Sequence, residues 1–335
     1  MIASGPANMN LLRRRFLYMA AGAATLPLLP RITRAQDFPS RPVTLVVPLP
    51  AGGAYDVVAR LLAEHMRTTL GQPVIVENIP GADRGILKVI HAAPDGYTLG
   101  IGGWAPYVLR PLVFSLPFDL LKDLEPVAFV ADAPFWIVSK TAIPAKDMQE
   151  FIAWLRANPG KASAATTGAG GGSHLCGLHL QSKTGTTFQF IPYRGGAPAL
   201  QDLLGGQTDF MCDFAANSLP HVRSGNLRAY AVMARSRWEA APEIPTADEA
   251  GLPGLYISNW TGLWAPPGTP KPVINKINAA IVAALADATV RKRYVELGQD
   301  IPAPAQLSPD ALRAFHKAEV EKWGPIIKAA NIQPN

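Results

Sequence analysis

Short β-branched runs and longer stretches with helical spacing alternate along the hydrophobic pattern of this chain. Residues 43–47 form an apolar run that is typical of a buried strand. Residues 57–70 follow with apolar side chains at the spacing of one helix face. This alternation continues and predicts an α/β fold. Further strands are expected at residues 73–77, 99–101, 132–140, 208–214 and 227–233, and helices at 86–92, 147–157, 273–285 and from 308 onward.

The loop between the first strand and the first helix is a candidate anion site. Gly52 and Gly53 leave it free of side-chain bulk, and Asp56 stands where a helix N-cap is expected. Unpaired backbone N–H groups at the positive end of a helix bind phosphate or carboxylate. The nucleotide fingerprints G-x-x-x-x-G-K-[ST] and G-x-G-x-x-G do not match this loop, so we expect a small anion. The alternative is a glycine turn that binds nothing.

The stretch Ser163–Ser173 (SAATTGAGGGS) repeats this design. It is typical of a strand that enters a glycine loop, and a helix is predicted from His174 onward. Thr166, Thr167 and Ser173 add hydroxyl donors to the glycine amides. Two such units in one chain predict two lobes, each of which offers a backbone anion site.

Three loops of the first half are expected to meet at one edge of the sheet. They are residues 50–56, 81–85 and 102–105, and each follows a predicted strand. In open parallel sheets, ligands bind beyond the carboxyl ends of the strands. Trp104, in the third loop, is either a stacking platform for a ligand or a packed core residue.

Residues 1–35 resemble an export signal. Arg13-Arg14-Arg15-Phe16-Leu17 fits the twin-arginine pattern, a short apolar stretch follows, and Thr33-Arg34-Ala35 is a candidate cleavage site. We therefore expect cleavage after Ala35 and a periplasmic protein. The alternative is an N-terminal anchor helix, although the apolar stretch is short for a membrane span.

The charge balance changes once this segment is set aside. Residues 1–35 contain five arginines and no acid, whereas the whole chain has 31 basic and 25 acidic residues. The remaining 26 basic and 25 acidic residues nearly cancel, so nothing indicates a nucleic-acid surface. No Cys/His cluster has metal-ligand spacing, and Cys176 and Cys212 form either one disulfide or two buried thiols.

A series of motifs resembles the Bug family, the periplasmic solute-binding proteins of tripartite tricarboxylate transporters. The likeness runs from Phe38-Pro39 to the end of the chain, and the motifs occur in the family's order. They are Pro50–Arg60 (PAGGAYDVVAR), Val76-Glu77-Asn78, Pro94–Thr98 (PDGYT), Tyr193–Ala199 (YRGGAPA), Asp202–Gln207 (DLLGGQ), Ser224–Ala229 (SGNLRA) and Trp260–Pro270.

The resemblance implies a two-lobed periplasmic binding protein of type II, with a ligand cleft between the lobes. The expected first lobe is residues 36–138 with 261–335, and the expected second lobe is residues 139–260. Crossings between the lobes are placed near Val138 and Trp260. It also implies a carboxylate ligand held largely by backbone amides and water, integral membrane transporter subunits as partners, a monomer, and no cofactor.

The chain departs from the family's pattern in the second loop. The family commonly has Gly-Ala-Gly-Gly there, whereas this chain has Gly81-Ala82-Asp83-Arg84-Gly85. One hypothesis is that Arg84 reaches the cleft and pairs with a second acidic group of the ligand. The alternative is that Asp83 and Arg84 face solvent or that Arg84 pairs with a surface acid. Tyr55 and Trp104 are also bulkier than usual, which favours an aromatic or otherwise bulky acid.

These observations favour binding without catalysis. The nucleophile-elbow pattern G-x-S-x-G fails at Leu175, so an enzyme on this fold is the less favoured alternative, and a periplasmic sensor is another. No metal ligand is predicted. The expected ligand-binding residues are Gly52, Gly53, Ala54, Tyr55, Asp56, Ala82, Arg84, Trp104, Thr166, Thr167, Gly168, Ser173, His174, Tyr193 and Asp213.

Overall fold

A computed structural model of the chain describes residue 1 and residues 38–168 and 170–329. The predicted export signal therefore lies outside the described residues, apart from Met1. The first of two five-stranded sheets has the order β2-β1-β3-β10-β4. Its strands are β1 (Val43–Val47), β2 (Val74–Asn78), β3 (Thr98–Gly103), β4 (Glu125–Ala131) and β10 (Thr261–Ala265).

The second sheet has the order β7-β6-β8-β5-β9. Its strands are β5 (Phe135–Lys140), β6 (Ser163–Thr166), β7 (Gln189–Pro192), β8 (Phe210–Phe214) and β9 (Leu227–Val232). In each sheet one strand runs against its neighbours: β10 in the first and β5 in the second. The remaining pairs are parallel, which agrees with the predicted α/β class.

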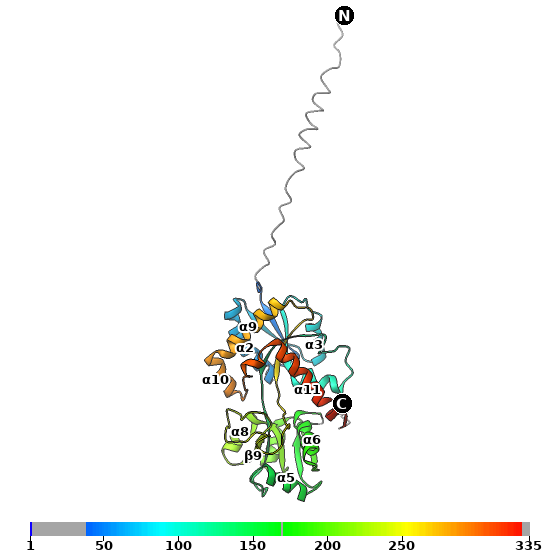
Figure 1. Ribbon diagram of the computed structural model, residues 1–335, viewed down its shortest axis with the longest axis vertical. Helices are drawn as coiled ribbons and strands as arrows, with labels where there is room; N and C mark the ends of the chain where they lie inside the picture. Colours follow the sequence, from blue (N-terminus) through cyan, green and yellow to red (C-terminus); the bar gives the residue numbers. More distant parts are fainter. Residues whose placement is uncertain (2–37, 169, 330–335) are drawn as a thin grey trace. The chain divides into compact units, whose positions relative to one another are not determined.

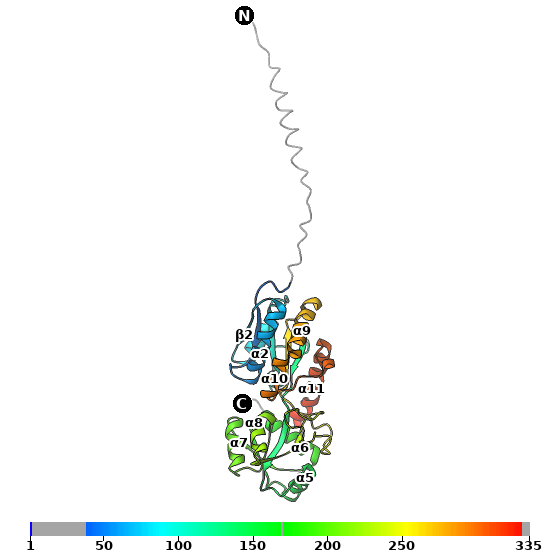
Figure 2. The same cartoon turned by 90° about the vertical axis from the view of Figure 1, so that its left-hand side faces the viewer.

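Helices cover both faces of each sheet (Figure 1). Around the first sheet, α2 and α9 lie on one side and α3 and α11 on the other; around the second, α8 and α6 take opposite sides (Figures 1 and 2). The helices are α2 (Ala54–Leu70), α3 (Ala82–Ile90), η1 (Trp104–Leu109), α4 (Arg110–Val113), α5 (Met148–Ala157), α6 (Gly172–Thr184), α7 (Gly196–Leu204), α8 (Ala215–Arg223), α9 (Lys271–Ala286), α10 (Ala288–Glu296), η2 (Pro304–Gln306) and α11 (Pro309–Ala329).

In the described part of the chain no single helix is long and apolar enough to span a membrane. Together α9 and α10 meet the length and composition needed, but the chain bends by 73° between them.

The chain changes sheets twice. It leaves the first sheet after Ala131 and enters the second at Phe135, and it returns to the first at Thr261. Trp260 therefore adjoins the return crossing. Val138 lies instead in the middle of β5, paired with Met211, so the outward crossing comes a few residues earlier than the sequence predicted. The predicted strand 132–140 is correspondingly shorter and begins at Phe135.

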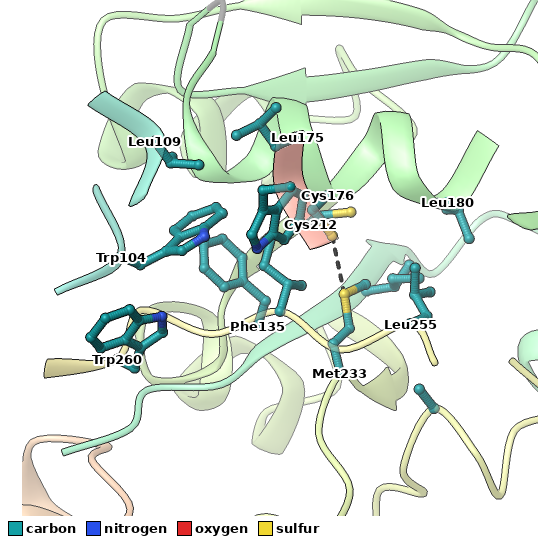
Figure 3. Packing of buried hydrophobic residues seen from close by; sticks show 14 of the residues in the cluster. Trp104, Leu109, Phe135, Leu175, Cys176, Leu180, Cys212, Met233, Leu255 and Trp260 are labelled. Atoms are coloured by element: carbon teal, nitrogen blue, oxygen red, sulfur yellow. Dashed lines mark hydrogen bonds between the residues drawn. The ribbon is translucent and has the colours of Figure 1, made fainter. Parts of the chain in front are cut away.

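One hydrophobic core continues from the first sheet to the second (Figure 3). Trp104 joins the two parts, because its ring meets Phe135 edge-on at 6.0 Å between centroids and Trp323 at 5.2 Å. Cys176 and Cys212 are buried in this core as free thiols, and Cys176 donates to Met233 Sδ at 3.0 Å. The alternative of two buried thiols is therefore the one observed.

Two carboxyl groups meet beside the outward crossing. Asp132 and Asp300 exchange backbone hydrogen bonds of 3.0 and 2.7 Å. Burial, together with Glu319 nearby, raises the pKa of Asp132 to about 6, although a bond from Ser258 opposes the shift. Burial and the charge of Asp132 raise the pKa of Asp300 to about 7. Folding therefore opposes ionisation of this pair.

We predict that Asp300→Asn stabilises the protein at alkaline pH. An acid whose pKa is raised by folding loses its proton first in the unfolded state, so stability falls as pH rises from about 4 to about 7. Each pKa unit corresponds to about 1.4 kcal/mol, so the variant should gain about 1–3 kcal/mol at about pH 8. Thermal unfolding from pH 4 to 8 checks this. Asp310→Asn, at an exposed position, is the control. The prediction would be contradicted if the stability of Asp300→Asn depended on pH in the same way as that of the wild type.

Candidate functional site

The carboxyl edges of the two sheets border the two crossings. β5 begins at the outward crossing and runs against β8, so the carboxyl end of β8 lies beside that crossing. β10 begins at the return crossing and runs against β3, so the carboxyl end of β3 lies there too. Parallel sheets bind ligands at this edge. The topology thus places both predicted glycine loops next to the crossings.

The first glycine loop leads directly into α2. Gly53 is the N-cap residue, in extended conformation (φ −79°, ψ 170°), and no side chain caps the helix. The prediction of Asp56 as N-cap is wrong, because α2 begins at Ala54 and Asp56 lies within its first turn. The Asp56 carboxylate instead accepts from the Gly52 N–H at 2.8 Å and pairs with Arg60 at 2.9 Å.

This arrangement decides which amides are available for a ligand. The Gly52 N–H is already bonded to Asp56, whereas the N–H groups of Ala54 and Tyr55 have no acceptor among the described residues. Burial raises the pKa of Asp56, but the bonds from Arg60 and Gly52 outweigh it and the pKa is lowered overall. Asp56 is therefore an anion that fixes the loop.

The second glycine loop has the same geometry. Gly171 is the N-cap of α6 with φ −71° and ψ 164°, again without a side-chain cap. Inside the loop, Ser173 Oγ accepts from the Thr167 N–H at 2.7 Å and lies 3.0 Å from Thr167 Oγ1. A side chain at Gly171 would collide with Thr167, since its Cβ would come within 2.6 Å of Oγ1. The repeated strand–glycine–helix design is confirmed.

A cavity of about 130 Å³, here called the inner cavity, opens at the carboxyl ends of β6 and β8. Three helices, α6, α7 and α8, begin at its wall, with Gly172, Gly196 and the residues next to Phe214. Each helix start contributes the positive end of its dipole, and the starts of α6 and α7 add first-turn N–H groups. The first N–H of α8, at Ala215, donates instead to Pro134 O at 3.0 Å. The lining residues are Phe135, Thr167, Gly172, Ser173, Gly196, Met211, Cys212, Asp213, Phe214 and Asn217.

A second cavity of about 140 Å³, here called the interlobe cavity, shares Phe214 and Asn217 with the inner one. Ala54, the first residue of α2, lies in its wall, so residues on both sides of the crossings contribute. Its other lining residues are Ala133, Pro134, Ala215, Ala216, Asn259, Leu297, Gly298 and Gln299. Among the described residues that line the two cavities there is no lysine or arginine.

Tyr55 and Trp104 are structural in this conformation. Tyr55 is 5% exposed, and its hydroxyl donates to Asn259 Oδ1 at 2.6 Å while accepting from the Ala105 N–H at 3.4 Å. It thereby ties α2 to the return crossing. Trp104 is 2% exposed and packs where Gly172 lacks a side chain, since a Cβ there would come within 2.9 Å of its ring. Of its two predicted roles, the structure shows the packed core residue.

Asp83 and Arg84, the charged pair that follows β2, have different surroundings. α3 begins at Ala82, so residues 82–85 form its first turn rather than a loop, contrary to the prediction. Asp83 forms a two-pronged ion pair with Arg110, at 2.5 and 2.6 Å. Arg84 is exposed, has no ion-pair partner among the described residues, and lines neither cavity. Asp83 therefore anchors α3 to α4.

The remaining expected residues fall into two groups. Ala54, Thr167, Ser173 and Asp213 line the cavities. Two others form hydrogen bonds within the protein. Tyr193 Oη donates to Asp202 at 2.7 Å, and His174 Nδ1 accepts from the Gly170 N–H, in the second glycine loop, at 3.1 Å. Neither cavity is lined by Gly52, Gly53, Tyr55, Asp56, Ala82, Arg84, Trp104, Thr166, Gly168, His174 or Tyr193.

Most other cavity residues escaped the sequence analysis, among them Phe135, Phe214, Asn217 and Asn259. The rings of Phe135 and Phe214 lie 4.3 Å apart, and Phe135 belongs both to the core and to the wall of the inner cavity. Asn217 lies in the first turn of the helix that follows β8. A polar residue at this place, just beyond the carboxyl end of a strand, could have been recognised in the sequence as a site candidate. Asn259 shows no such signal, because only its bond to Tyr55 reveals its role.

Asp213 brings a carboxyl group to the inner cavity. It is 2% exposed and accepts from Ser218 Oγ at 2.7 Å, from Asn217 Nδ2 at 3.2 Å and from the Phe214 N–H. Ser218 accepts in turn from Trp136 Nε1 at 2.8 Å. Burial raises the pKa of Asp213 to about 6 against the opposing effect of these bonds.

A larger cavity of about 330 Å³ lies elsewhere, between residues 236–239 and the stretch from Arg291 to Ile301. Basic and acidic side chains both line it, and it borders the carboxyl end of α10, where the helix dipole is negative. It suits a small anion less well than the two smaller cavities. In the described residues no group of three or more His, Cys, Asp or Glu side chains is arranged to hold a metal ion.

Known proteins share this architecture. Residues 58–332 match the family model described as the tripartite tricarboxylate transporter family receptor, TctC. The periplasmic binding protein BugD is 39% identical, with a TM-score of 0.68 over 89% of this chain and 100% of BugD. MatC from Rhodopseudomonas palustris, solved with malate, is 39% identical, with a TM-score of 0.68 over 87% of this chain and 100% of MatC.

A second R. palustris protein, solved with adipate, is 29% identical, with a TM-score of 0.71 over 89% of this chain and all of that one. The family match covers most of the chain, and these structures cover 87–89% of it. The chain therefore belongs to the TctC family of Bug-type periplasmic solute-binding proteins.

Proposed function

We propose that this protein captures a small organic acid, as its carboxylate, in the cleft between the lobes. It delivers the acid to an integral membrane transporter of the tripartite tricarboxylate type. The first lobe comprises residues 39–131 with 261–329, and the second comprises residues 135–260, so the crossings serve as hinges for closure. The protein acts as a monomer, in the periplasm, without catalysis.

The observation that carries this proposal is the convergence of uncapped helix starts on cavities without cationic side chains. α6, α7 and α8 begin at the inner cavity, and α2 begins at the interlobe cavity. Aligned N–H groups at a helix start bind a carboxylate without a full positive charge. Malate in MatC and adipate in the second R. palustris protein support a dicarboxylate. Both cavities are smaller than the ~300–1,000 Å³ of typical drug sites, which favours a small acid.

The geometry around Ser173 supports binding over catalysis. His174 Nδ1 accepts from the Gly170 N–H, and the Ser173 hydroxyl is engaged with Thr167. A hydrolase needs a base within hydrogen-bonding distance of its nucleophile. These two neighbours in sequence do not form such a pair.

We predict that Gly53→Val abolishes tight binding of the acid. The backbone of Gly53 suits any residue, and a Cβ there meets only Pro50 O at 3.8 Å, so the variant should fold. Its methyl groups would cover the N–H groups of the first turn of α2. A thermal-shift screen of mono- and dicarboxylates first identifies the ligand, since an acid at about 100 times its Kd stabilises by about 2.7 kcal/mol.

Calorimetry then compares Gly53→Val with Thr68→Val, which adds the same side chain at an exposed position of α2. We expect Gly53→Val to weaken binding at least about tenfold, a loss of about 1.4 kcal/mol or more. An affinity within about twofold of wild type would place the carboxylate elsewhere.

Arg84→Ala should reduce affinity less than about tenfold, because an exposed charge at the rim of a site acts mainly on the association rate. Arg84→Lys, which keeps the charge, is the matched control. Stopped-flow fluorescence at low and high salt measures both rates. If Arg84→Ala lowered the affinity more than about tenfold through faster dissociation, Arg84 would have to enter the cleft when the ligand binds.

Export is predicted to depend on Arg13 and Arg14, with cleavage after Ala35. Replacing both with Lys should retain precursor in the cytoplasm, because the twin-arginine pattern requires the pair. The same double change at Arg31 and Arg34 is the control. Immunoblots of cell fractions report the outcome, and normal export of the first variant would remove the twin-arginine assignment.

A further inference from the structure

The larger cavity, of about 330 Å³, is not used in the proposed capture of a carboxylate. Its volume lies within the ~300–1,000 Å³ of typical small-molecule sites, whereas the inner and interlobe cavities are smaller. Its lining residues between 236 and 239 come before the return crossing, and those between 291 and 301 come after it. A molecule bound in this cavity would therefore touch parts of the chain that the crossing separates.

A buried hydroxyl group at this cavity lacks a hydrogen-bond partner. Tyr294 lies in α10 and lines the cavity, its side chain is 0% exposed, and its hydroxyl bonds to no other described residue. Burial of a hydroxyl without a partner costs free energy, and a Phe ring would fill the same space without that cost. A bound molecule that supplies the partner accounts for the hydroxyl.

Two carboxyl groups at the cavity also lack partners. Burial, followed by the charges of Asp132 and Glu239, raises the pKa of Asp300 to about 7, so Glu239 lies near Asp300. Neither the Asp300 nor the Glu239 side chain forms a hydrogen bond or ion pair with another described residue. Arg237 lines the cavity too but pairs with Glu249 at 2.9 Å. The two acids therefore lack a counter-charge, which a cationic group in the cavity would supply.

Cationic and apolar side chains complete the lining. Arg291 and Lys292 are exposed and have no ion-pair partner in the described part of the chain. Val295, on the same helix, is 40% exposed, and Ile301 is half-buried. The cavity thus presents unpaired charges of both signs beside an apolar wall.

We propose that this cavity is a second binding site, for a free amino acid with an aliphatic side chain. The two unpaired acids hold its ammonium group, and the Tyr294 hydroxyl donates to its carboxylate. The two exposed cations attract that carboxylate at the rim, and the aliphatic side chain covers Val295 and Ile301. A dicarboxylate fits less well, because its second carboxylate would meet the acids. The site is separate from the one proposed for carboxylate capture and does not depend on it.

The second site adjoins the first without overlapping it. Gln299 lines both the larger cavity and the interlobe cavity, and both cavities are present in the same conformation of the protein. An amino acid and a captured carboxylate can therefore be bound together. Each ligand then stabilises this arrangement of the chain, so the presence of one leaves or raises the affinity for the other.

Calorimetry at about pH 8, where Asp300 is ionised, tests the site with leucine and valine. Isocaproate and isovalerate are the analogues that lack the ammonium group, and isoamylamine and isobutylamine are those that lack the carboxylate. Wild-type protein should bind at least one of the two amino acids with a Kd of about 1 mM or tighter. Both analogues of that amino acid should bind about tenfold or more weakly, because each loses a charge-assisted hydrogen bond.

Two variants locate the amino acid in the larger cavity. Asp300→Asn should weaken its binding about tenfold or more, since the charge that holds the ammonium group is removed. Tyr294→Phe should weaken it about threefold or more, and it keeps the buried ring, so the fold is retained. Arg293→Gln is the matched control, because Arg293 lies on the same helix, pairs with Glu296 at 2.7 Å and does not line the cavity. Its affinity should stay within about twofold of wild type.

The outcomes separate this proposal from carboxylate capture. The second site is overturned if wild type binds neither amino acid at up to about 10 mM, if an analogue binds as tightly as its parent, or if Asp300→Asn or Tyr294→Phe keeps full affinity. Displacement of the amino acid by the acid that the thermal-shift screen identifies would place it in the interlobe cavity and would also overturn the site. All of these results leave carboxylate capture standing. Failure of every carboxylate in that screen would contradict carboxylate capture alone.

Discussion

Uncapped helix starts are the feature on which this structure depends. α5, α10 and α11 begin with Asp147, Asp287 and Ser308, whose side chains accept from the first-turn N–H groups. α2, α3, α6 and α7 begin instead with Gly53, Gly81, Gly171 and Gly195, which cannot do so. α9 needs less capping, because Pro270 and Pro272 carry no N–H. Of these four glycine-started helices, α2, α6 and α7 begin at the wall of a cavity, so their first-turn amides remain available there.

The sheet topology turns this local property into a site. The reversed strands β5 and β10 both start at crossings, so the glycine loops that follow β1 and β6 lie near those crossings. Side chains then fix the loops without occupying the amides needed for a ligand. The Asp56 carboxylate accepts from the Gly52 N–H, and Asp83 pairs with Arg110 and so holds α3 against α4. Both acids therefore stabilise the protein's own structure. Tyr55 bonds Asn259 and couples α2 to the return crossing.

The sequence predicted the parts of the fold that depend on local pattern. β1 has the predicted bounds, and α11 begins with Pro309 after Ser308, as expected. Several helix starts were predicted two to four residues late, because Asp56 and His174 were taken as the beginning of helices that start inside the glycine loops. β4 and α10 were not predicted. The contacts of Asn217 and Asn259 depend on segments far apart in the chain, so spacing alone could not reveal them.

A crystal structure with a bound dicarboxylate tests the central claim most directly. The account predicts a ligand carboxylate within about 2.7–3.2 Å of N–H groups at the start of α2 or α6, with no lysine or arginine side chain in contact with it. A carboxylate paired with Arg84, or a ligand in the larger cavity between residues 236–239 and α10, would contradict it.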